Sequence, residues 1–341
     1  PIGEPHNYII KLSDDVLPEP DAILVTGITP QQTITGGITE AEFLKIFQEE
    51  VAVPETIFVG FNTVRFDDEF MRFLHYRNFY DPYEWQWQDG KSRWDLLDVV
   101  RMTRALRPDG IEWPFDSNGK PSNRLELLTD ANKISHDNAH DALADVQASI
   151  ALARLIHNKQ PKLFYYLLKM RHKKEVAALV LEDKPFVYTS GKYPSEFEKT
   201  TVVGLLAEHP GKKGGALVFD LRYDPSAFVD LSPEELAEAM RRRSDEEGPR
   251  LPIKTLKYNR CPAVAPLSVL DDLSKTRIDI AVNECIKNFH TLKHLQDQLE
   301  VKIKLAIELL DKAQQAKLLE DEMEVDGRLY EGFFSDSDKT K

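Results

Sequence analysis

The chain has 341 residues, of which 42% are hydrophobic and 30% are charged, a balance typical of a soluble globular protein of about two domains. Its 44 basic and 57 acidic residues give a formal charge of −13, which argues against a polycation that coats nucleic acid but allows a local basic groove. No run approaches the roughly 18 apolar residues of a membrane span, and two cysteines build no disulfide framework, so we expect a cytoplasmic protein with no membrane partner.

Residues 1–158 alternate short apolar runs with stretches of helical spacing, which predicts an α/β unit. The continuous apolar run at 56–60 is typical of a buried strand, and residues 26–30 are typical of a turn. The predicted strands are 8–12 and 56–60, and the predicted helices are 40–50, 67–78, 95–106, one that starts at 123, and 138–157.

Residues 161–182 combine lysines and arginine with aromatic side chains. Cations neutralise phosphates and aromatic faces stack on bases, so this stretch is a candidate surface for single strands. The same spacing is typical of an amphipathic helix with solvated lysines, and both interpretations stay open.

The rest of the chain predicts a second, β-rich domain. Short strands separated by Gly and Pro suggest a small barrel or sandwich, with an inserted helix after an N-cap at Ser232. The predicted elements are strands 186–188, 201–206 and 216–221, helices 233–243 and 278–319, and a solvated acidic segment 320–338.

The first candidate site follows the predicted strand that ends at Gly60. Asp67 lies at the start of the next predicted helix. Ligands of open α/β sheets bind at the carboxyl ends of strands, and Gly60 marks such an end. The alternative is that Asp67 only caps its helix.

The second candidate site is the segment 138–145. His140 lies at the mouth of an Ala-rich helix, and Asp145 lies one turn further on, on the side that carries Ala148 and Leu152. A carboxylate that faces the core is costly unless it is paired or binds a metal. The alternative is that Asp141 caps the helix and Asp145 is solvated.

Together the two segments predict a site for a hard cation with a histidine beside it. Carboxylates select Mg²⁺ or Mn²⁺ over Zn²⁺. Such ions stabilise the attacking and leaving oxygens when a phosphodiester is cleaved, and a histidine can take the proton from water.

These motifs carry a resemblance to a known family. Segments 62–69 and 140–145 resemble the second and third motifs of the DEDDh 3′–5′ exonucleases, which have a ribonuclease H-like fold. Further segments resemble the bacterial exonuclease I family, which degrades single-stranded DNA from the 3′ end; they are 76–83, 92–99, 105–108 and 331–336. The resemblance runs along almost the whole chain. It implies an α/β exonuclease domain at 1–160, an SH3-like barrel with inserted helices that encloses DNA at 161–318, and an acidic linker at 319–341.

The resemblance assigns roles to matching positions. Asp67 and Asp145 are expected to ligate the metals of a two-Mg²⁺ site, with Mn²⁺ as the alternative, and His140 is expected to be the general base. The expected product is 5′-mononucleotides, and the expected state is a monomer. The positions expected to line the substrate are Thr26, Gly27, Ile28, Asn62, Arg65 and Phe66.

A basic stripe of Arg101, Arg104 and Arg107 is predicted by their spacing on one helix. The alternative is a solvated face. In the resembled family the position of Arg107 lies near the place where the acidic tail of single-stranded DNA-binding protein docks, so that protein is an expected partner beside single-stranded DNA.

The sequence departs from the family at its start. The family's first motif, Asp-x-Glu on the first strand, has no counterpart at a predicted strand end, and the family's C-terminal helical domain has none either. We therefore expect an N-terminally truncated internal fragment that is inactive, or nearly so, by itself.

Two other classes of protein are alternatives to the exonuclease interpretation. The adjacent pair His140-Asp141 is typical of HD-type phosphohydrolases. That class needs further histidines, and the available ones are His75, His136 and His157. HD-type phosphohydrolases are also mostly helical, unlike the predicted α/β unit. A non-catalytic module that binds single-stranded nucleic acid is the main alternative. A Ser- or Cys-dependent hydrolase is unsupported, because there is no Gly-x-Ser-x-Gly elbow.

Overall fold

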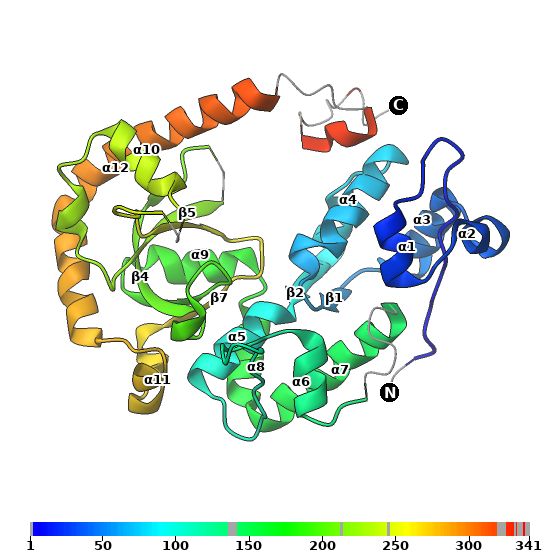
Figure 1. Cartoon of the computed structure of the whole chain (residues 1–341), viewed down its shortest axis with the longest axis horizontal. Coiled ribbons are helices and arrows are strands. Elements are labelled where there is room, and N and C mark those ends of the chain that lie inside the picture. The colour runs from blue at the N-terminus through cyan, green and yellow to red at the C-terminus, as the bar shows by residue number, and fades with distance from the viewer. Residues whose placement is uncertain are drawn as a thin grey trace. The chain divides into compact units, whose positions relative to one another are not determined.

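The computed structural model describes residues 3–135, 142–211, 214–243, 246–318, 325–330, 332 and 337 (Figure 1). The chain divides into two compact units. Unit 1 consists of Pro1–Leu96, Arg124–Leu155 and Met323–Lys341, and unit 2 consists of Leu97–Asn123 and Ile156–Glu322. Each unit is therefore assembled from segments that are distant in the sequence.

Unit 1 contains two short strands and a set of helices. The strands are β1 (Ile57–Gly60) and β2 (Ser92–Asp95). The helices are α1 (Pro20–Thr26), α2 (Pro30–Gly36), α3 (Glu40–Ile46), α4 (Asp67–Arg77), α6 (Leu125–Ala131) and the first part of α7 (Ala142–Lys159).

Local signals fix where several of these helices begin. Capping boxes start α2 and α3, where the hydroxyls of Thr29 and Thr39 accept hydrogen bonds from the backbone three residues further on. The helices predicted at 40–50 and 67–78 are confirmed, and α3 continues as a π-helical turn, Phe47–Val51. The helix predicted over 138–157 is confirmed from Ala142 onward, and residues 136–141 lie outside the described residues.

The strands β1 and β2 pair in parallel, with Ile57 opposite Ser92 and Gly60 opposite Asp95. The prediction of a buried strand at 56–60 is wrong as to burial, because Ile57 and Val59 keep 39% and 50% of their surface exposed. Only the other face of β1, which carries Phe58, packs on a core cluster.

Residues 8–12 do not form the predicted strand. Ile10 makes a single isolated bridge to Ile38, with hydrogen bonds from the Lys11 and Ile38 amides. The residues have strand-forming side chains, but a strand also needs a partner along its length to satisfy its backbone groups. Here the partner is one residue long.

An aromatic cluster forms a core of unit 1. The ring of Phe47 lies 5.7 Å from Phe58, 5.7 Å from His75 and 5.8 Å from Trp85, measured between centroids. His75 is fully buried; its Nδ1 lies 2.6 Å from the Met71 carbonyl oxygen and its Nε2 lies 3.0 Å from Gln48 Nε2. Burial lowers the pKa of His75 and favours the neutral ring. His75 is thus a satisfied core histidine, which removes one ligand that an HD-type site would need.

A short segment from the far end of the chain packs on α4. Residues Val325–Tyr330 form a 3₁₀ helix in which Leu329 is buried, so the expectation of a wholly solvated acidic segment is wrong at this residue. The Tyr330 hydroxyl donates a hydrogen bond to the Glu69 carboxylate. The Tyr330 ring also meets the Phe73 ring edge-on, 5.7 Å between centroids. This segment therefore covers part of α4.

Unit 2 is built on a five-stranded antiparallel sheet with the order β6-β5-β4-β3-β7. Its strands are β3 (Phe186–Thr189), β4 (Thr200–Glu208), β5 (Gly215–Asp220), β6 (Ile253–Lys257) and β7 (Ala263–Pro266). Its helices are α5 (Leu96–Leu106), whose first residue belongs to unit 1, the end of α7, α8 (Pro161–Lys169), α9 (Lys173–Leu181), α10 (Pro233–Arg241), α11 (Asp272–Arg277) and α12 (Val282–Leu318). The three predicted strands are confirmed, and so is the inserted helix with its Ser232 cap.

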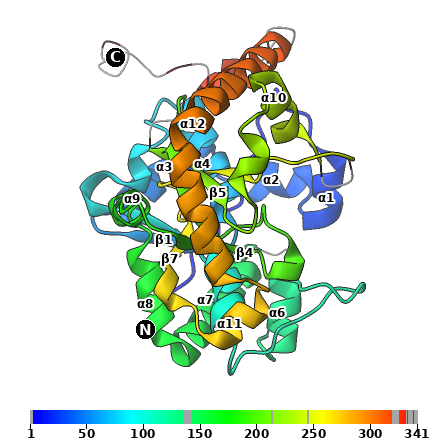
Figure 2. The ribbon, with the colours of Figure 1, turned by 90° about the vertical axis from the view of Figure 1, so that its left-hand side faces the viewer.

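The long helix α12 crosses one face of this sheet (Figure 2). It approaches β4 closely at Gly204, where a Cβ would lie 2.9 Å from the Phe289 ring. Amide groups of Asn288 and Gln296 donate hydrogen bonds to the backbone carbonyls of Leu221 and Leu206, at 3.0 and 2.6 Å. Among the described helices, none has both the length and the apolar character that a bilayer crossing needs.

The contrast between Trp85 and Trp87 tests the core of unit 1. Trp85 is 4% exposed and Trp87 is 62% exposed. We expect Trp85→Ala to lower the free energy of unfolding of unit 1 by about 3–5 kcal/mol, because it empties the aromatic cluster. Trp87→Ala should change it by about 0.5 kcal/mol or less. Urea denaturation followed by circular dichroism compares the two, and equal losses would contradict this core.

Candidate functional site

The candidate site begins where β1 and β2 end together, at Gly60 and Asp95. The chain turns sharply after Gly60, where an added Cβ would lie 2.2 Å from the Thr63 methyl group. Asn62 adopts the left-handed conformation, with φ of 65°, and a 3₁₀ turn at Thr63–Arg65 follows. This compact turn delivers Asp67 as the first residue of α4.

Asp95 holds this turn in place. Its carboxylate accepts hydrogen bonds from the Asn62 and Val64 amides, at 2.8 and 3.1 Å, and the residue is buried. The sequence interpretation missed Asp95 because it assigned the residue to the following helix, whereas the helix begins at Leu96. An acid directly after an apolar residue at a strand end was the available signal.

Three consecutive acids begin α4, and their neighbours differ. Asp68 is buried and forms an ion pair with the buried Arg93 of β2. Glu69 pairs with Arg72 at 2.6 Å and accepts the Tyr330 hydroxyl. Within the described residues, Asp67 is the one of the three without an ion pair. Among the described residues, the geometry therefore separates one carboxylate without an ion pair from two with one, of which Asp68 pairs with β2 and Glu69 pairs within α4.

The pKa of Asp67 is raised. Nearby protein atoms partly exclude water from the carboxylate, although the side chain is exposed, and the negative charges of Asp95 and Asp145 add to the effect. Asp145 lies in the first turn of α7 and is half-buried rather than turned wholly to the core, while Ala148 and Leu152 are fully buried. The structure thus brings the two predicted metal ligands within reach of each other's charge.

The predicted metal site also includes a general base, His140, and needs further metal ligands. His140 lies outside the described residues, so its role as general base stays a prediction. Among the described residues, no group of three or more His, Cys, Asp or Glu side chains is arranged to hold a metal ion. Asp67 and Asp145 supply oxygen donors that suit a hard cation, but not a complete set.

The residues predicted to line the substrate fall in two places. Asn62, Arg65 and Phe66 lie in the turn that leads to Asp67, and Arg65 and Phe66 are exposed. Thr26 is the last residue of α1, and Gly27 and Ile28 lie on the exposed turn that follows, where Gly27 takes the left-handed conformation that ends α1. Their contact with a substrate stays a prediction.

The predicted basic stripe on α5 is wrong. Arg104 is 2% exposed, and its guanidinium pairs with Glu198 at 2.9 Å and donates to the Pro114 and Ser122 carbonyls. Helical spacing placed it on one face with Arg101 and Arg107, but spacing does not say whether that face meets solvent or protein. Arg107 stays partly exposed, with Asp271 at 3.1 Å and the Val269 carbonyl at 2.8 Å.

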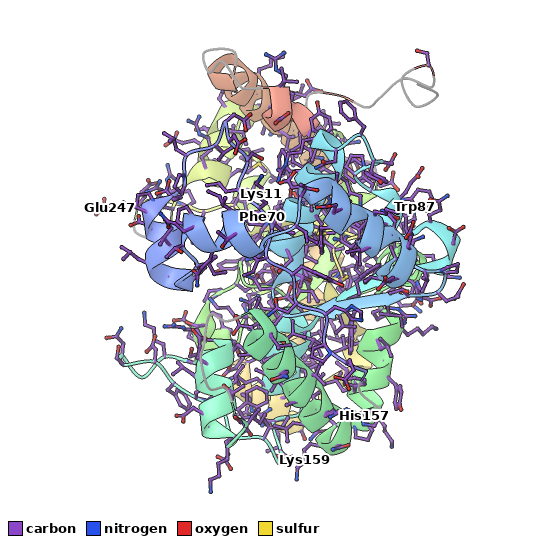
Figure 3. The ribbon with its side chains drawn as sticks, turned by 90° about the vertical axis from the view of Figure 1, so that its right-hand side faces the viewer. Lys11, Phe70, Trp87, His157, Lys159 and Glu247 are labelled. Carbon is purple, nitrogen blue, oxygen red and sulfur yellow. The ribbon has the colours of Figure 1, made fainter. Side chains whose placement is uncertain are left out.

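The stretch 161–182 forms α8 and α9, and α8 is amphipathic. Leu163 and Leu167 are buried, whereas Lys162, Tyr165 and Lys169 are exposed on the other side. His157, labelled with Lys159 in Figure 3, places its Nε2 2.9 Å from the Tyr165 hydroxyl. The exposed face therefore carries both cations and an aromatic ring, which leaves both sequence interpretations open.

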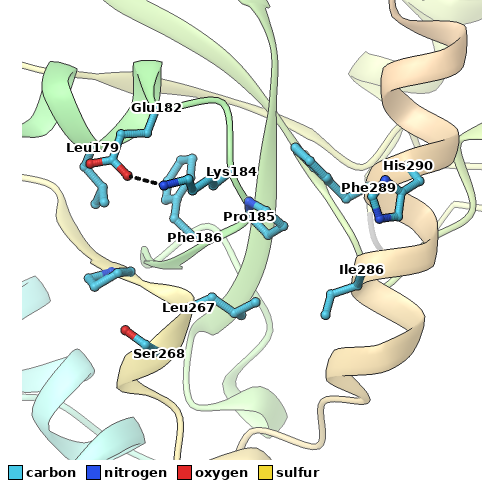
Figure 4. Close-up of a pocket in the computed structure, with 11 residues that line it drawn as sticks. Leu179, Glu182, Lys184, Pro185, Phe186, Leu267, Ser268, Ile286, Phe289 and His290 are labelled. Carbon is cyan, nitrogen blue, oxygen red and sulfur yellow. Dashed lines mark hydrogen bonds and ion pairs between the residues drawn. The ribbon is translucent and has the colours of Figure 1, made fainter.

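Unit 2 also contains a pocket of ≈440 Å³ between α9, β3, the segment after β7, and α12 (Figure 4). Its charged edge includes Lys184, 3.4 Å from Glu182. Its lining offers no paired carboxylates and no activated nucleophile. The lining residues are Leu179, Glu182, Lys184, Pro185, Phe186, Pro266, Leu267, Ser268, Ile286, Phe289 and His290.

Comparison with known proteins gives consistent matches along the chain. A family model described as "Exonuclease" matches residues 1–153, and one described as "Exonuclease I SH3-like domain" matches residues 171–329. Exodeoxyribonuclease I of Escherichia coli (strain K12) is 42% identical over 342 residues, which are 99% of this chain and 70% of that protein.

Solved structures agree with these matches. The crystal structure of E. coli exonuclease I with a dA16 oligonucleotide superposes with a TM-score of 0.90 at 40% identity, covering 99% of this chain and 72% of the other. An ExoI/SSB-Ct complex superposes with a TM-score of 0.87 at 41% identity, covering 99% and 71%. These matches confirm the predicted fold class, a ribonuclease H-like exonuclease domain followed by an SH3-like domain.

The raised pKa of Asp67 gives a pH-dependent stability. The Asp67 carboxyl has a higher pKa in the folded chain than in the unfolded chain, so the fold favours its protonated form. Its contribution to stability is therefore complete below the unfolded pKa and is lost as the pH rises through the folded pKa. We therefore expect Asp67→Asn to raise the melting temperature at pH 7, and the gain to disappear near about pH 3. Asp130→Asn, an exposed acid of α6, is the control, and a gain that persists in acid would contradict the electrostatic cause.

Proposed function

Because the chain belongs to the exodeoxyribonuclease I family, whose members are nucleases, we propose that it carries part of the active site of a metal-dependent 3′–5′ exonuclease. The proposed substrate is single-stranded DNA, and the proposed products are 5′-mononucleotides. One observation carries this proposal: Asp67 has no cationic partner among the described residues, and its pKa is raised by nearby protein atoms that exclude water and by the negative charges of Asp95 and Asp145. Carboxylates that repel one another at a strand end are suited to bind a cation.

Asp67 and Asp145 would hold the divalent ion, for which Mg²⁺ is the proposed choice. Their oxygen donors fit a hard cation, and a bound ion would lower the repulsion between them. When bound, the metal stabilises negative charge on the attacking and leaving oxygens. His140 would accept the proton from the attacking water. Asn62, Arg65 and Phe66 would orient the 3′-terminal nucleotide from the neighbouring turn, and Thr26, Gly27 and Ile28 would pack against it.

The carboxylate set that the resemblance implies has two further members. The DEDDh resemblance calls for an Asp-x-Glu pair on a first strand in addition to Asp67 and Asp145, and no described strand ends in that motif. We infer that this polypeptide alone hydrolyses DNA poorly or not at all. Adding a strand with the motif should restore the reaction.

A digestion assay tests the catalytic proposal. A single-stranded oligonucleotide labelled at its 3′ end is incubated with Mg²⁺ and either this chain or a version extended by an N-terminal Asp-x-Glu strand. We expect labelled mononucleotide only with the extended version, and a loss on the order of 100-fold or more when that version carries Asp145→Asn.

The other outcomes are also informative. Robust Mg²⁺-dependent activity of the chain itself, lost in Asp145→Ala, would contradict the proposed inactivity. No activity in either version, with both shown to be folded by circular dichroism, would contradict the catalytic proposal. Tight binding of the oligonucleotide in that case would favour the alternative function, a module that binds single strands without cutting them.

Single-stranded DNA-binding protein is the proposed protein partner, through its acidic C-terminal tail. A related exonuclease I was solved as an SSB-Ct complex, and Arg107 offers a partly exposed guanidinium in unit 2. Its present anionic neighbour, Asp271, is half-exposed, so an acidic peptide can compete for the same cation.

Arg107→Ala should weaken binding of an acidic tail peptide about 10-fold, because a charge-assisted contact is lost. Fluorescence anisotropy with a labelled peptide measures this. Arg154→Ala, an exposed arginine of α7, serves as the matched control. An affinity that is unchanged in Arg107→Ala would exclude this docking site.

A further inference from the structure

Two aromatic side chains stand exposed at the start of α4. Phe66 precedes the helix and is 60% exposed, and Phe70 lies one turn further on and is 63% exposed. Their ring centroids are 4.9 Å apart and their planes are inclined by 62°. Phe70 is labelled in Figure 3. We call this pair the aromatic platform.

The platform is unusual within its own helix. Leu74 and His75 of α4 are buried, as the apolar face of a helix normally is. Phe66 and Phe70 support each other through an edge-to-face contact but leave most of their surface in water. Exposure of two adjacent large rings is costly, on the order of 25 cal/mol per Å² of apolar surface, unless a ligand covers them.

The surroundings of the platform indicate what that ligand is. Asp67, the proposed metal ligand, lies between the two rings in sequence, and Arg65 precedes them. The Arg65 side chain is exposed, and in the part of the chain that the structure describes it makes no ion pair. A cation beside exposed aromatic rings is the combination that holds a single strand, because the cation meets a phosphate and the rings meet a base.

We propose that Phe70, together with Phe66, stacks on a base at the 3′ end of the single strand and so positions the terminal phosphodiester next to Asp67. This inference rests on the proposed function and adds a substrate-positioning residue, Phe70, that neither motif spacing nor the family resemblance pointed to. A stacked base is recognised by its π-face, so the platform acts on any base and gives no sequence preference.

Binding of a single-stranded oligonucleotide to the full chain tests the platform without requiring catalysis. Affinity is measured by fluorescence anisotropy in EDTA, with a natural oligonucleotide and with one whose last two 3′ nucleotides lack their bases. Phe70→Ala should weaken binding of the natural oligonucleotide about 5- to 30-fold. Phe70→Tyr, which keeps the ring, should stay within about 2-fold of the wild type.

Matched controls separate stacking from general effects. Phe79→Ala removes another ring, 97% exposed and just beyond the other end of α4, and should leave the affinity unchanged. The oligonucleotide without terminal bases should bind the wild type and Phe70→Ala equally, because there is no base to stack. Thermal melts followed by circular dichroism establish that each variant is folded.

Each contrary result has its own meaning. Unchanged affinity in Phe70→Ala, while the wild type binds the natural oligonucleotide, overturns the platform and leaves the proposed function intact. An equal loss with and without terminal bases overturns stacking as the cause. A wild-type chain that does not bind the oligonucleotide at all contradicts the proposed function itself, and the platform with it.

Discussion

The parallel pairing of β1 with β2 is the constraint on which the candidate site depends. It brings Gly60 and Asp95 to the same edge, where the Asp95 carboxylate can accept the two amides of the turn after Gly60. Hydrogen bonds to a charged group contribute about 1.5–3 kcal/mol each, so the turn has one well-defined path. The start of α4, and with it Asp67, is placed by backbone geometry rather than by contacts of the Asp67 side chain.

The three consecutive acids at the start of α4 differ in their electrostatic partners. Asp68 is neutralised by Arg93 inside the protein, and Glu69 is held by Arg72. The Asp68–Arg93 pair joins the helix to β2, and removing one partner of this buried pair would leave an uncompensated charge. The Glu69–Arg72 pair lies within α4 itself. Asp67 carries no such partner among the described residues and lies in the negative potential of Asp95 and Asp145. The cation proposed to bind at Asp67 would neutralise this accumulation of negative charge.

Sequence patterns predicted what depends on local chemistry. Helix α4 and the Ser232 cap of α10 follow from spacing and capping residues, and both are confirmed. Errors arose where distant residues decide: residues 8–12 lack a partner strand, and Arg104 is buried against Glu198, far away in sequence. For the site, the sequence pointed to Asp67 and Asp145, whereas Asp95 was missed because the residue was assigned to the following helix instead of to the end of β2. The role of His140 stays a prediction.

The discontinuity of unit 1 has a consequence for folding during synthesis. Leu329 and Tyr330 pack on α4, yet a ribosome adds them only after all of unit 2 up to residue 318 has been made. Domains usually fold in the order of their synthesis. Here α4 of unit 1 is an exception, because the strands and helices of unit 2 can be complete before residues 325–330 pack on α4. Phe73 is thus an apolar group of the nascent chain that stays uncovered until residues 325–330 have been translated.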